Sequence, residues 1–171
     1  WAELLERGYS VRAMVRGSSS NPDKGAHLTA LPGGRLTLVD GDLECQPSLV
    51  AAFAGADAVI HTAAAVELSA RESIITASVD GVKNVLSAVD ACASIQAFVH
   101  TSSVAAVQRY DKDPDHIFSE ADWNDWSSLA NGDAYGTAKT QAERVVQAHF
   151  RGDPRHSACL NPAVVIGPVM T

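Results

Sequence analysis

The residues best suited to chemistry are a tyrosine and a lysine, Tyr135 and Lys139, in the segment Tyr-Gly-Thr-Ala-Lys. A spacing of four places both side chains on one face of a helix. A phenol, with a pKa of about 10, is a poor acid at neutral pH, but a nearby ammonium favours the phenolate. Such a pair can act as a tuned proton donor. The same spacing also arises on ordinary helix surfaces, so the pair alone does not define a site.

A second candidate group follows the apolar stretch 98–100. Thr101, Ser102 and Ser103 stand where that predicted strand ends, and a serine at the carboxyl end of a parallel strand can point into a ligand crevice. The structural alternative is a serine that caps the strand end. Strand, serine, polar loop, tyrosine–lysine helix and a further strand, in that order, form a far more specific pattern than any one of these parts.

Strands and helices alternate along the chain. Short apolar stretches predict strands, and apolar residues at helical spacing predict helices. The expected strands are 10–15, 36–39, 58–61, 97–100 and 158–160, and the expected helices are one that ends at residue 5 and those at 47–54, 72–91 and 133–150. This order is typical of βαβ units, so we expect the α/β class, with a Rossmann-like, doubly wound parallel sheet and helices on both faces.

With these parts in this order, the chain resembles the extended short-chain dehydrogenase/reductase family, within the NAD-dependent epimerase/dehydratase superfamily. The segments that carry the resemblance, in chain order, are 11–16, 40–43, 59–64, 81–86, 98–103, Tyr135 with Lys139, and 161–168. The dihydroflavonol reductase-like branch of aldehyde and ketone reductases is the most similar. Asp122-Trp123 with Trp126 resembles its acidic-Trp loop, and segment 104–108 lacks the Val-Tyr-Gly that sugar-nucleotide epimerases usually carry.

The resemblance implies a catalytic set and a cofactor site. Ser103 would bind the substrate oxygen, Tyr135 would deliver the proton, and Lys139 would tune the tyrosine and hold the ribose hydroxyls. The cofactor-binding residues that it implies are Arg16, Asp42, Leu43, Thr62, Ala63, Ala64, Thr101, Tyr135, Lys139, Pro162, Val164 and Val165. No metal site is expected.

The end of the predicted strand 10–15 bears on the choice of cofactor. It ends at Arg16, with no acidic residue before Asp23. An acid at this place binds the ribose 2′-hydroxyl of NAD, whereas an arginine accommodates the 2′-phosphate of NADP. We therefore expect NADP, with NAD as the alternative, and the implied reaction is reduction of a carbonyl to an alcohol by hydride transfer. An NAD-dependent sugar-nucleotide epimerase or dehydratase and a non-catalytic NADP-sensing protein are the alternative functions.

The extent of the chain also differs from the family pattern. Its twelve glycines do not form the family's phosphate-binding glycine motif. We therefore expect residues 1–171 to be one partial NAD(P)-binding domain that lacks the first strand and the C-terminal substrate region, folds marginally alone and binds NADP(H) poorly. Helices 72–91 and 133–150 are candidates for pairing with a second copy in a homodimer. His61 and His100, in strand contexts, are expected to pack in the core or to border the site.

The composition limits the partners. With 13 Lys and Arg against 20 Asp and Glu, the 171-residue chain carries a net charge of −7. No basic run or basic helix face occurs, which argues against nucleic acid or a membrane surface. A small-molecule carbonyl or alcohol is the expected partner. The three cysteines are odd in number and far apart, so a disulfide framework is not expected, and a reducing compartment, the cytoplasm, fits best.

Overall fold

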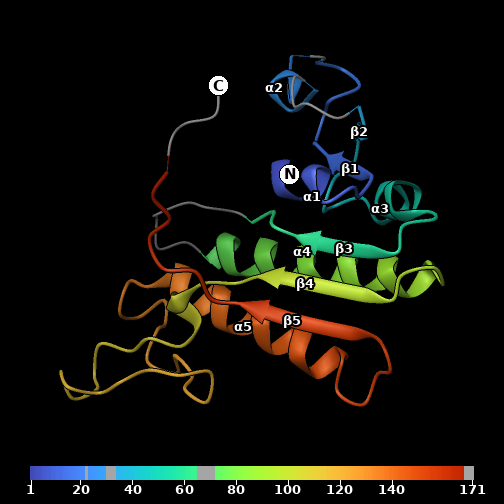
Figure 1. Ribbon diagram of the computed structural model, residues 1–171. Helices are drawn as coiled ribbons and strands as arrows, with labels where there is room; N and C mark the ends of the chain where they lie inside the picture. Colours follow the sequence, from blue (N-terminus) through green and yellow to red (C-terminus); the bar gives the residue numbers. More distant parts are fainter. Residues whose placement is uncertain (22, 30–33, 65–71, 168–171) are drawn as a thin grey trace.

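The computed structural model describes residues 1–21, 23–29, 34–64 and 72–167. Strands and helices alternate along the chain (Figure 1). The strands are β1 (Val11–Met14), β2 (Leu36–Val39), β3 (Ala58–His61), β4 (Ala97–Thr101) and β5 (His156–Leu160). The helices are α1 (Ala2–Glu6), α2 (Ala26–Thr29), α3 (Gln46–Phe53), α4 (Glu72–Ala91) and α5 (Ala134–His149), with a 3-10 turn η1 (Val104–Ala106).

The strands form two separate parallel sheets in the described part of the chain. β1 pairs with β2, with Val11 opposite Leu36. β4 lies between β3 and β5, with Ala97 opposite both Ala58 and His156. A helix joins each pair of neighbouring strands, which accounts for their parallel pairing. No backbone hydrogen bonds between β1 and β3 join the two sheets in the described part of the chain.

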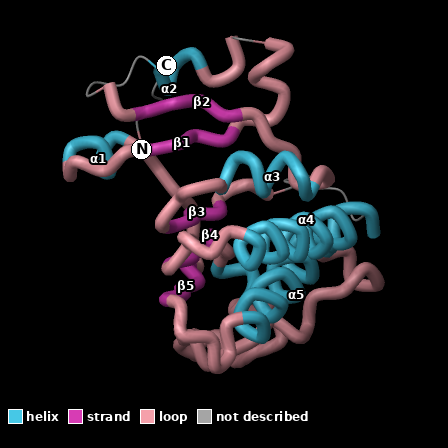
Figure 2. Tube along the Cα trace, turned by 90° about the vertical axis from the view of Figure 1, so that its right-hand side faces the viewer, coloured by secondary structure: helices cyan, strands magenta, loops and turns pink. Residues whose placement is uncertain are grey.

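The helices are divided between two sides of the strands. Figure 2 shows α3, α4 and α5 on one side and α1 on the other. Side chains alternate along a strand, so Val59 and Phe98 are buried beneath the helices while Ile60 is 41% exposed on the opposite face. The strands as a whole therefore have helices on both sides. The three-stranded sheet has α4 and α5 on the same face. Consecutive crossovers of the same hand place both helices on that face.

The main core lies between the three-stranded sheet and its helices. Its largest fully buried side chains are Phe98, Leu49, Ile95, Val85, Val89 and Val146. Full burial of each such side chain stabilises the fold by about 1.5–3 kcal/mol. Met14 and Val39 pack against the same cluster. The two-stranded sheet is therefore fixed to the core that carries β3, β4 and β5.

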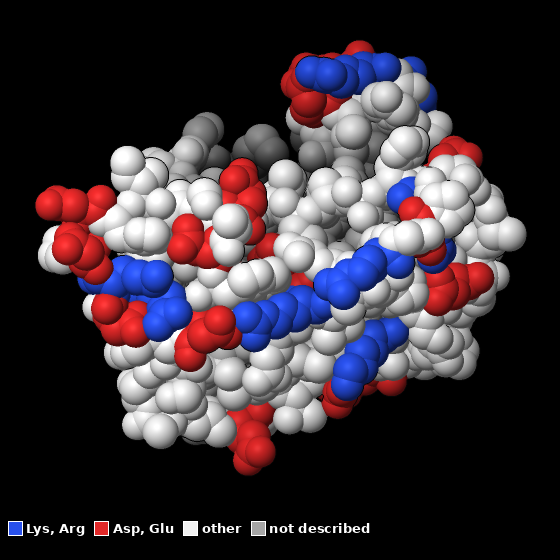
Figure 3. All heavy atoms as spheres, turned by 90° about the horizontal axis from the view of Figure 1, so that it is seen from below, with Lys and Arg blue, Asp and Glu red and all other residues white. Residues whose placement is uncertain are grey.

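Charged residues of both signs share the surface. On the face that Figure 3 shows, Lys and Arg side chains lie among Asp and Glu side chains. Among the described residues, no helix combines the length and the apolar character needed to cross a bilayer. Cys45, Cys92 and Cys159 are all free thiols.

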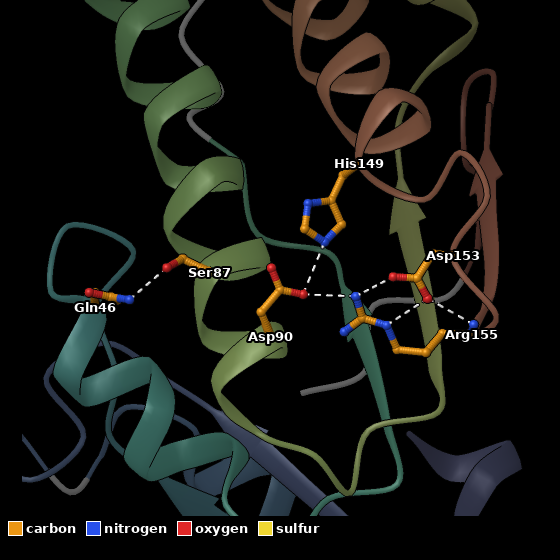
Figure 4. A network of polar contacts seen from close by, with 6 residues as sticks. All are labelled: Gln46, Ser87, Asp90, His149, Asp153 and Arg155. Atoms are coloured by element: carbon orange, nitrogen blue, oxygen red, sulfur yellow. Dashed lines mark hydrogen bonds and ion pairs between the residues drawn. The ribbon is translucent and has the colours of Figure 1, made fainter.

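A polar network joins α4, α5 and the start of β5 (Figure 4). Asp90 of α4 accepts a hydrogen bond from Arg155 at 2.8 Å and contacts His149 Nε2 at 3.2 Å. Arg155 also donates to Asp153, and this contact lowers the pKa of the Asp153 carboxyl to about 2. The network fixes α5 against α4 at the end of the helix farthest from Tyr135.

Candidate active site

The carboxyl ends of β4 and β5 bring three of the predicted residues together. Hydrogen bonding continues past the strand ends, since the Val104 N–H donates to the Pro162 carbonyl at 3.0 Å. Thr101, Ser103 and Pro162 therefore lie beside one another. This is the edge of a parallel sheet at which a ligand is expected.

Helix α5 places Lys139 between Tyr135 and the end of β4. Asp133 caps the helix by accepting a hydrogen bond from the Gly136 N–H at 2.8 Å, which fixes where α5 begins. Lys139 is 8% exposed. Its Nζ donates to the Thr101 carbonyl at 3.5 Å and lies 5.7 Å from the centroid of the Tyr135 ring. Burial lowers the pKa of Lys139, and the structure therefore holds a desolvated amine against the phenol.

Ser103 has a hydroxyl that can donate to a ligand. Its Oγ accepts a hydrogen bond from the Ala105 N–H at 3.2 Å as the cap of η1, so the capping alternative is realised. An accepted hydrogen bond leaves the O–H proton available. Ser103 is half-buried, whereas Ser102 is 4% exposed. Of the two serines, Ser103 is therefore the one that a ligand can reach.

The same helix carries a buried carboxylate that is not among the residues predicted from the sequence. Glu143, one turn beyond Lys139, is 3% exposed. Its Oε1 accepts a hydrogen bond from Gln147 Nε2 at 3.0 Å, and its Oε2 accepts one from Asn161 Nδ2 at 2.7 Å. Asn161 Nδ2 also donates to the Ser103 carbonyl at 3.0 Å. The spacing of four from Lys139 is the signal that could have found Glu143.

Two buried histidines lie close to the lysine. The rings of His61 and His100 stack with centroids 5.5 Å apart, and the residues are 6% and 3% exposed. Burial, with a smaller effect of the Lys139 charge, lowers the pKa of His61 to about 4. Burial, followed by His61 and Lys139, lowers the pKa of His100 to about 3. Both histidines are buried, as the core alternative predicts, and both lie close enough to Lys139 to feel its charge.

The predicted cofactor residue of the first sheet, Arg16, has a second cation beside it. Arg16 is exposed after β1, and Lys24 Nζ donates to the Arg16 carbonyl at 3.1 Å. Lys24 is not among the residues predicted from the sequence. Asp40 is engaged by the same loop, because Ser19 donates to its carboxylate and the Gly17 N–H donates at 2.7 Å, and these bonds lower the pKa of Asp40.

The remaining predicted cofactor residues follow the strand ends. The turn of Asp42 and Leu43 is held from two helices, since the Asp42 N–H donates to Ser48 Oγ at 2.9 Å and Asn84 Nδ2 donates to the Leu43 carbonyl at 2.7 Å. No hydrogen bond in the described part of the chain joins this turn to the end of β4. The others are exposed: Thr62, Ala63 and Ala64 after β3, and Val164 and Val165 after β5.

No metal centre is formed by the residues that the structure describes. Within 1–21, 23–29, 34–64 and 72–167, no three His, Cys, Asp or Glu side chains gather closely enough to hold a metal ion.

Parallel strands joined by helices, with polar residues at their carboxyl ends, define an α/β fold of the Rossmann type. The whole chain, residues 1–171, matches the NAD dependent epimerase/dehydratase family, and the chain belongs to that family. Cinnamoyl-CoA reductase 1 of Arabidopsis thaliana is 37% identical in an alignment 171 residues long. The alignment covers 96% of this chain and 48% of that protein. The chain spans about half the length of the curated relatives it matches.

Two solved structures share the fold over nearly the whole chain. Vestitone reductase from alfalfa (Medicago sativa) has a TM-score of 0.77 and 31% identity, with 94% of this chain and 50% of that chain covered. Gre2 from Candida albicans in complex with NADPH has a TM-score of 0.82 and 26% identity, with 97% and 54% covered. The predicted resemblance to the dihydroflavonol reductase-like branch is confirmed.

Proposed function

We propose that this chain carries the proton donor of an NADP(H)-dependent reductase that converts an aldehyde or ketone to an alcohol. The observation that carries the proposal is the buried Lys139 amine, 5.7 Å from the Tyr135 ring centroid and beside the strand end that holds Ser103. Its relatives support it, since two are reductases by name and the Gre2 structure contains NADPH.

The proposed mechanism divides the work between three side chains. A bound nicotinamide would supply the hydride to the carbonyl carbon. Ser103 donates its O–H to the carbonyl oxygen and holds that oxygen near the phenol. Tyr135 gives its proton to the oxygen as negative charge develops there, so the C=O bond becomes an alcohol. The Lys139 ammonium stabilises the charge left on the tyrosine oxygen, because opposite charges interact strongly in a desolvated site.

The residues at the strand ends fit a phosphorylated dinucleotide. The small residues at 62–64 are exposed, which allows a flat ligand to approach the backbone. Arg16 and Lys24 place two cations at the end of β1, where a 2′-phosphate would gain charge-assisted hydrogen bonds. Asp40, which could bind a ribose hydroxyl, is already engaged by Ser19 and Gly17. This arrangement favours NADP over NAD.

A turnover screen tests the function. The full natural chain that carries these residues is assayed for NADPH oxidation with aliphatic and aromatic aldehydes and ketones, from hexanal to cinnamaldehyde and acetophenone. Tyr135→Phe is expected to lower kcat by about 100-fold or more, because a general acid contributes that much. Tyr110→Phe, at a tyrosine that is 74% exposed, is the matched control. Equal turnover by Tyr135→Phe would exclude the tyrosine as the proton donor.

An NAD-dependent sugar-nucleotide epimerase or dehydratase is the second candidate, because the family takes its name from these reactions. Such an enzyme regenerates its cofactor and is expected to retain NAD through purification. Nicotinamide nucleotide released by denaturing the purified protein distinguishes the two reactions. A non-catalytic NADP-sensing protein would instead bind NADPH and turn over no member of the panel.

We also propose that a further strand pairs between β1 and β3 in the full natural chain, since neither of these facing strands has a partner on that side in the described residues. Residues 1–171 alone are then expected to fold marginally and to bind NADP(H) poorly. Tight binding of NADPH by that segment would contradict this.

The three free thiols favour the cytoplasm as the location of the protein.

A homodimer through α4 and α5 is the proposed assembly. The two helices pack on each other, and a groove lined by Ile75, Val79, Thr137 and Gln141 runs between them. A second copy would cover this groove with the same two helices. Light scattering of the full natural chain, with Gln141→Arg compared against the unsubstituted protein, measures the association.

A further inference from the structure

We propose that Glu143 and Asn161 are positioning residues that orient Ser103 for the reaction, an inference that rests on the proposed reductase function. We call this pair the Glu143–Asn161 clamp. Neither side chain touches the reacting atoms. The clamp acts through the backbone carbonyl of Ser103, which Asn161 Nδ2 contacts at 3.0 Å.

Glu143 is a buried carboxylate whose partners are amides. With 3% of the residue exposed, its charge is costly to bury unless hydrogen bonds replace the lost water. Both oxygens have such bonds, from Gln147 at 3.0 Å and from Asn161 at 2.7 Å. Gln147 lies on the exposed side of α5. The bond to Asn161 is therefore the one that links Glu143 to the interior.

Asn161 uses both of its amide hydrogens in this arrangement. One N–H is directed at Glu143 Oε2 and the other at the Ser103 carbonyl. Because both partners are acceptors, the nitrogen of the amide must face them, which fixes the orientation of the side chain. The carboxylate thus holds the amide with its nitrogen toward the Ser103 carbonyl.

The clamp sets the distance between the serine and the helix that carries the proton donor. Helix α5 contacts segment 101–103 at two points: Lys139 Nζ donates to the Thr101 carbonyl, and Glu143 reaches the Ser103 carbonyl through Asn161. The Ser103 hydroxyl is therefore fixed relative to the tyrosine and lysine on the same helix. A misplacement of about 1 Å can lower a rate about 100-fold, so this contact matters for turnover beyond its effect on stability.

Four variants of the full natural chain separate positioning from stability. Asn161→Asp sets a second carboxylate against Glu143 and an oxygen against the Ser103 carbonyl. In the double variant Asn161→Asp with Glu143→Gln, the glutamine amide can donate a hydrogen bond to the new carboxylate at position 161. An oxygen of that carboxylate still faces the Ser103 carbonyl, so the contact to Ser103 is not restored. Glu143→Gln alone keeps an acceptor for Asn161. Gln147→Ala, on the exposed side of the helix, is the matched control.

Three quantities are measured for each variant: kcat with the panel member of highest kcat/KM, the Kd of NADPH by fluorescence, and the thermal midpoint. Asn161→Asp is expected to lose about 100-fold in kcat together with several degrees in midpoint. The double variant is expected to regain most of the midpoint but not the turnover. Glu143→Gln and Gln147→Ala are expected to keep kcat within about fivefold of the unsubstituted protein, since one hydrogen bond is worth about 1 kcal/mol. All four variants are expected to keep the Kd of NADPH within about threefold of the unsubstituted value.

Two results overturn the clamp alone. In one, turnover of the double variant returns in step with its thermal midpoint. In the other, the loss of turnover in Asn161→Asp is matched by an equal loss of NADPH affinity. If the unsubstituted protein binds NADPH and turns over no member of the panel, the proposed function itself is wrong, and the clamp is overturned with it.

Discussion

Acidification below about pH 6.5 is expected to weaken the fold through His61 and His100. The two rings are buried against each other, with centroids 5.5 Å apart, and Phe98 stacks on His61 at 6.4 Å. Lys139 of α5 is the cation that faces them. A proton added to either ring would be desolvated and repelled by that cation, so both histidines stay neutral in the folded protein until pH approaches 4.

The magnitude follows from the difference between the folded and unfolded pKa values. An unfolded histidine titrates near 6.5, whereas His61 and His100 titrate near 4 and 3 in the fold. Between these limits the unfolded chain binds more protons, so stability falls as pH falls. Each histidine removes about 1.2 kcal/mol from the free energy of unfolding between pH 6 and pH 5, and the pair about 2.4 kcal/mol. This is a large part of a total stability of about 5–15 kcal/mol.

Urea unfolding of the full natural chain at pH 6 and pH 5, at constant ionic strength, measures the loss. His100→Phe keeps an aromatic ring beside His61 and removes one titrating group, so its loss of stability between the two pH values should be about 1.2 kcal/mol smaller. His156→Gln, at an exposed histidine of β5, is the matched control and should behave as the unsubstituted protein does. An equal pH-dependent loss in His100→Phe would refute the reasoning.

Three further predictions concern single side chains. Gly136→Ala should lower the free energy of unfolding, measured in urea, by about 1–3 kcal/mol. The reason is that a Cβ at position 136 would meet Asn124 Nδ2 at 2.9 Å and would also meet Asp133 and Ser127. Gly132→Ala should cost less, because a Cβ at position 132 meets no atom within 4 Å, although the φ of Gly132 is positive. Arg16→Gln should raise the KM for NADPH about tenfold, as expected for the loss of one charged contact, and leave the KM for NADH unchanged. Asp90→Ala should lower stability by about 1 kcal/mol with no change in kcat.

The elements that the sequence predicted best are those with a long or uniform pattern. Helix α4 (72–91) and strands β2 and β3 have the predicted bounds, because the helix has an apolar stripe at helical spacing and the strands are short apolar stretches. The four-residue helix α2 and the three-residue turn η1 were missed, since neither is long enough to show a period.

The sequence predicted the residues of the candidate site but not their supporting contacts. Tyr135, Lys139 and Ser103 stay a prediction, which rests on the spacing of the tyrosine and lysine on α5 and on the place of the serine after β4. Lys24 and Glu143 were not predicted, because lysines in loops and glutamates on helices are usually solvated, and the spacing of four between Lys139 and Glu143 also occurs on exposed helix faces. Their positions depend on contacts with Arg16 and Asn161 that are distant in sequence or not periodic.

The distribution of charge along α5 explains how the clamp and the proton donor can share one helix. A glutamate four residues after a lysine commonly forms an ion pair with it, and such a pair would neutralise the ammonium. Here the oxygens of Glu143 are engaged by amides, and Lys139 Nζ bonds to a neutral carbonyl. The histidines beside Lys139 are neutral as well. Glu143 therefore does not offset the charge of the Lys139 ammonium, and the phenol of Tyr135 is the partner that the proposed proton transfer requires.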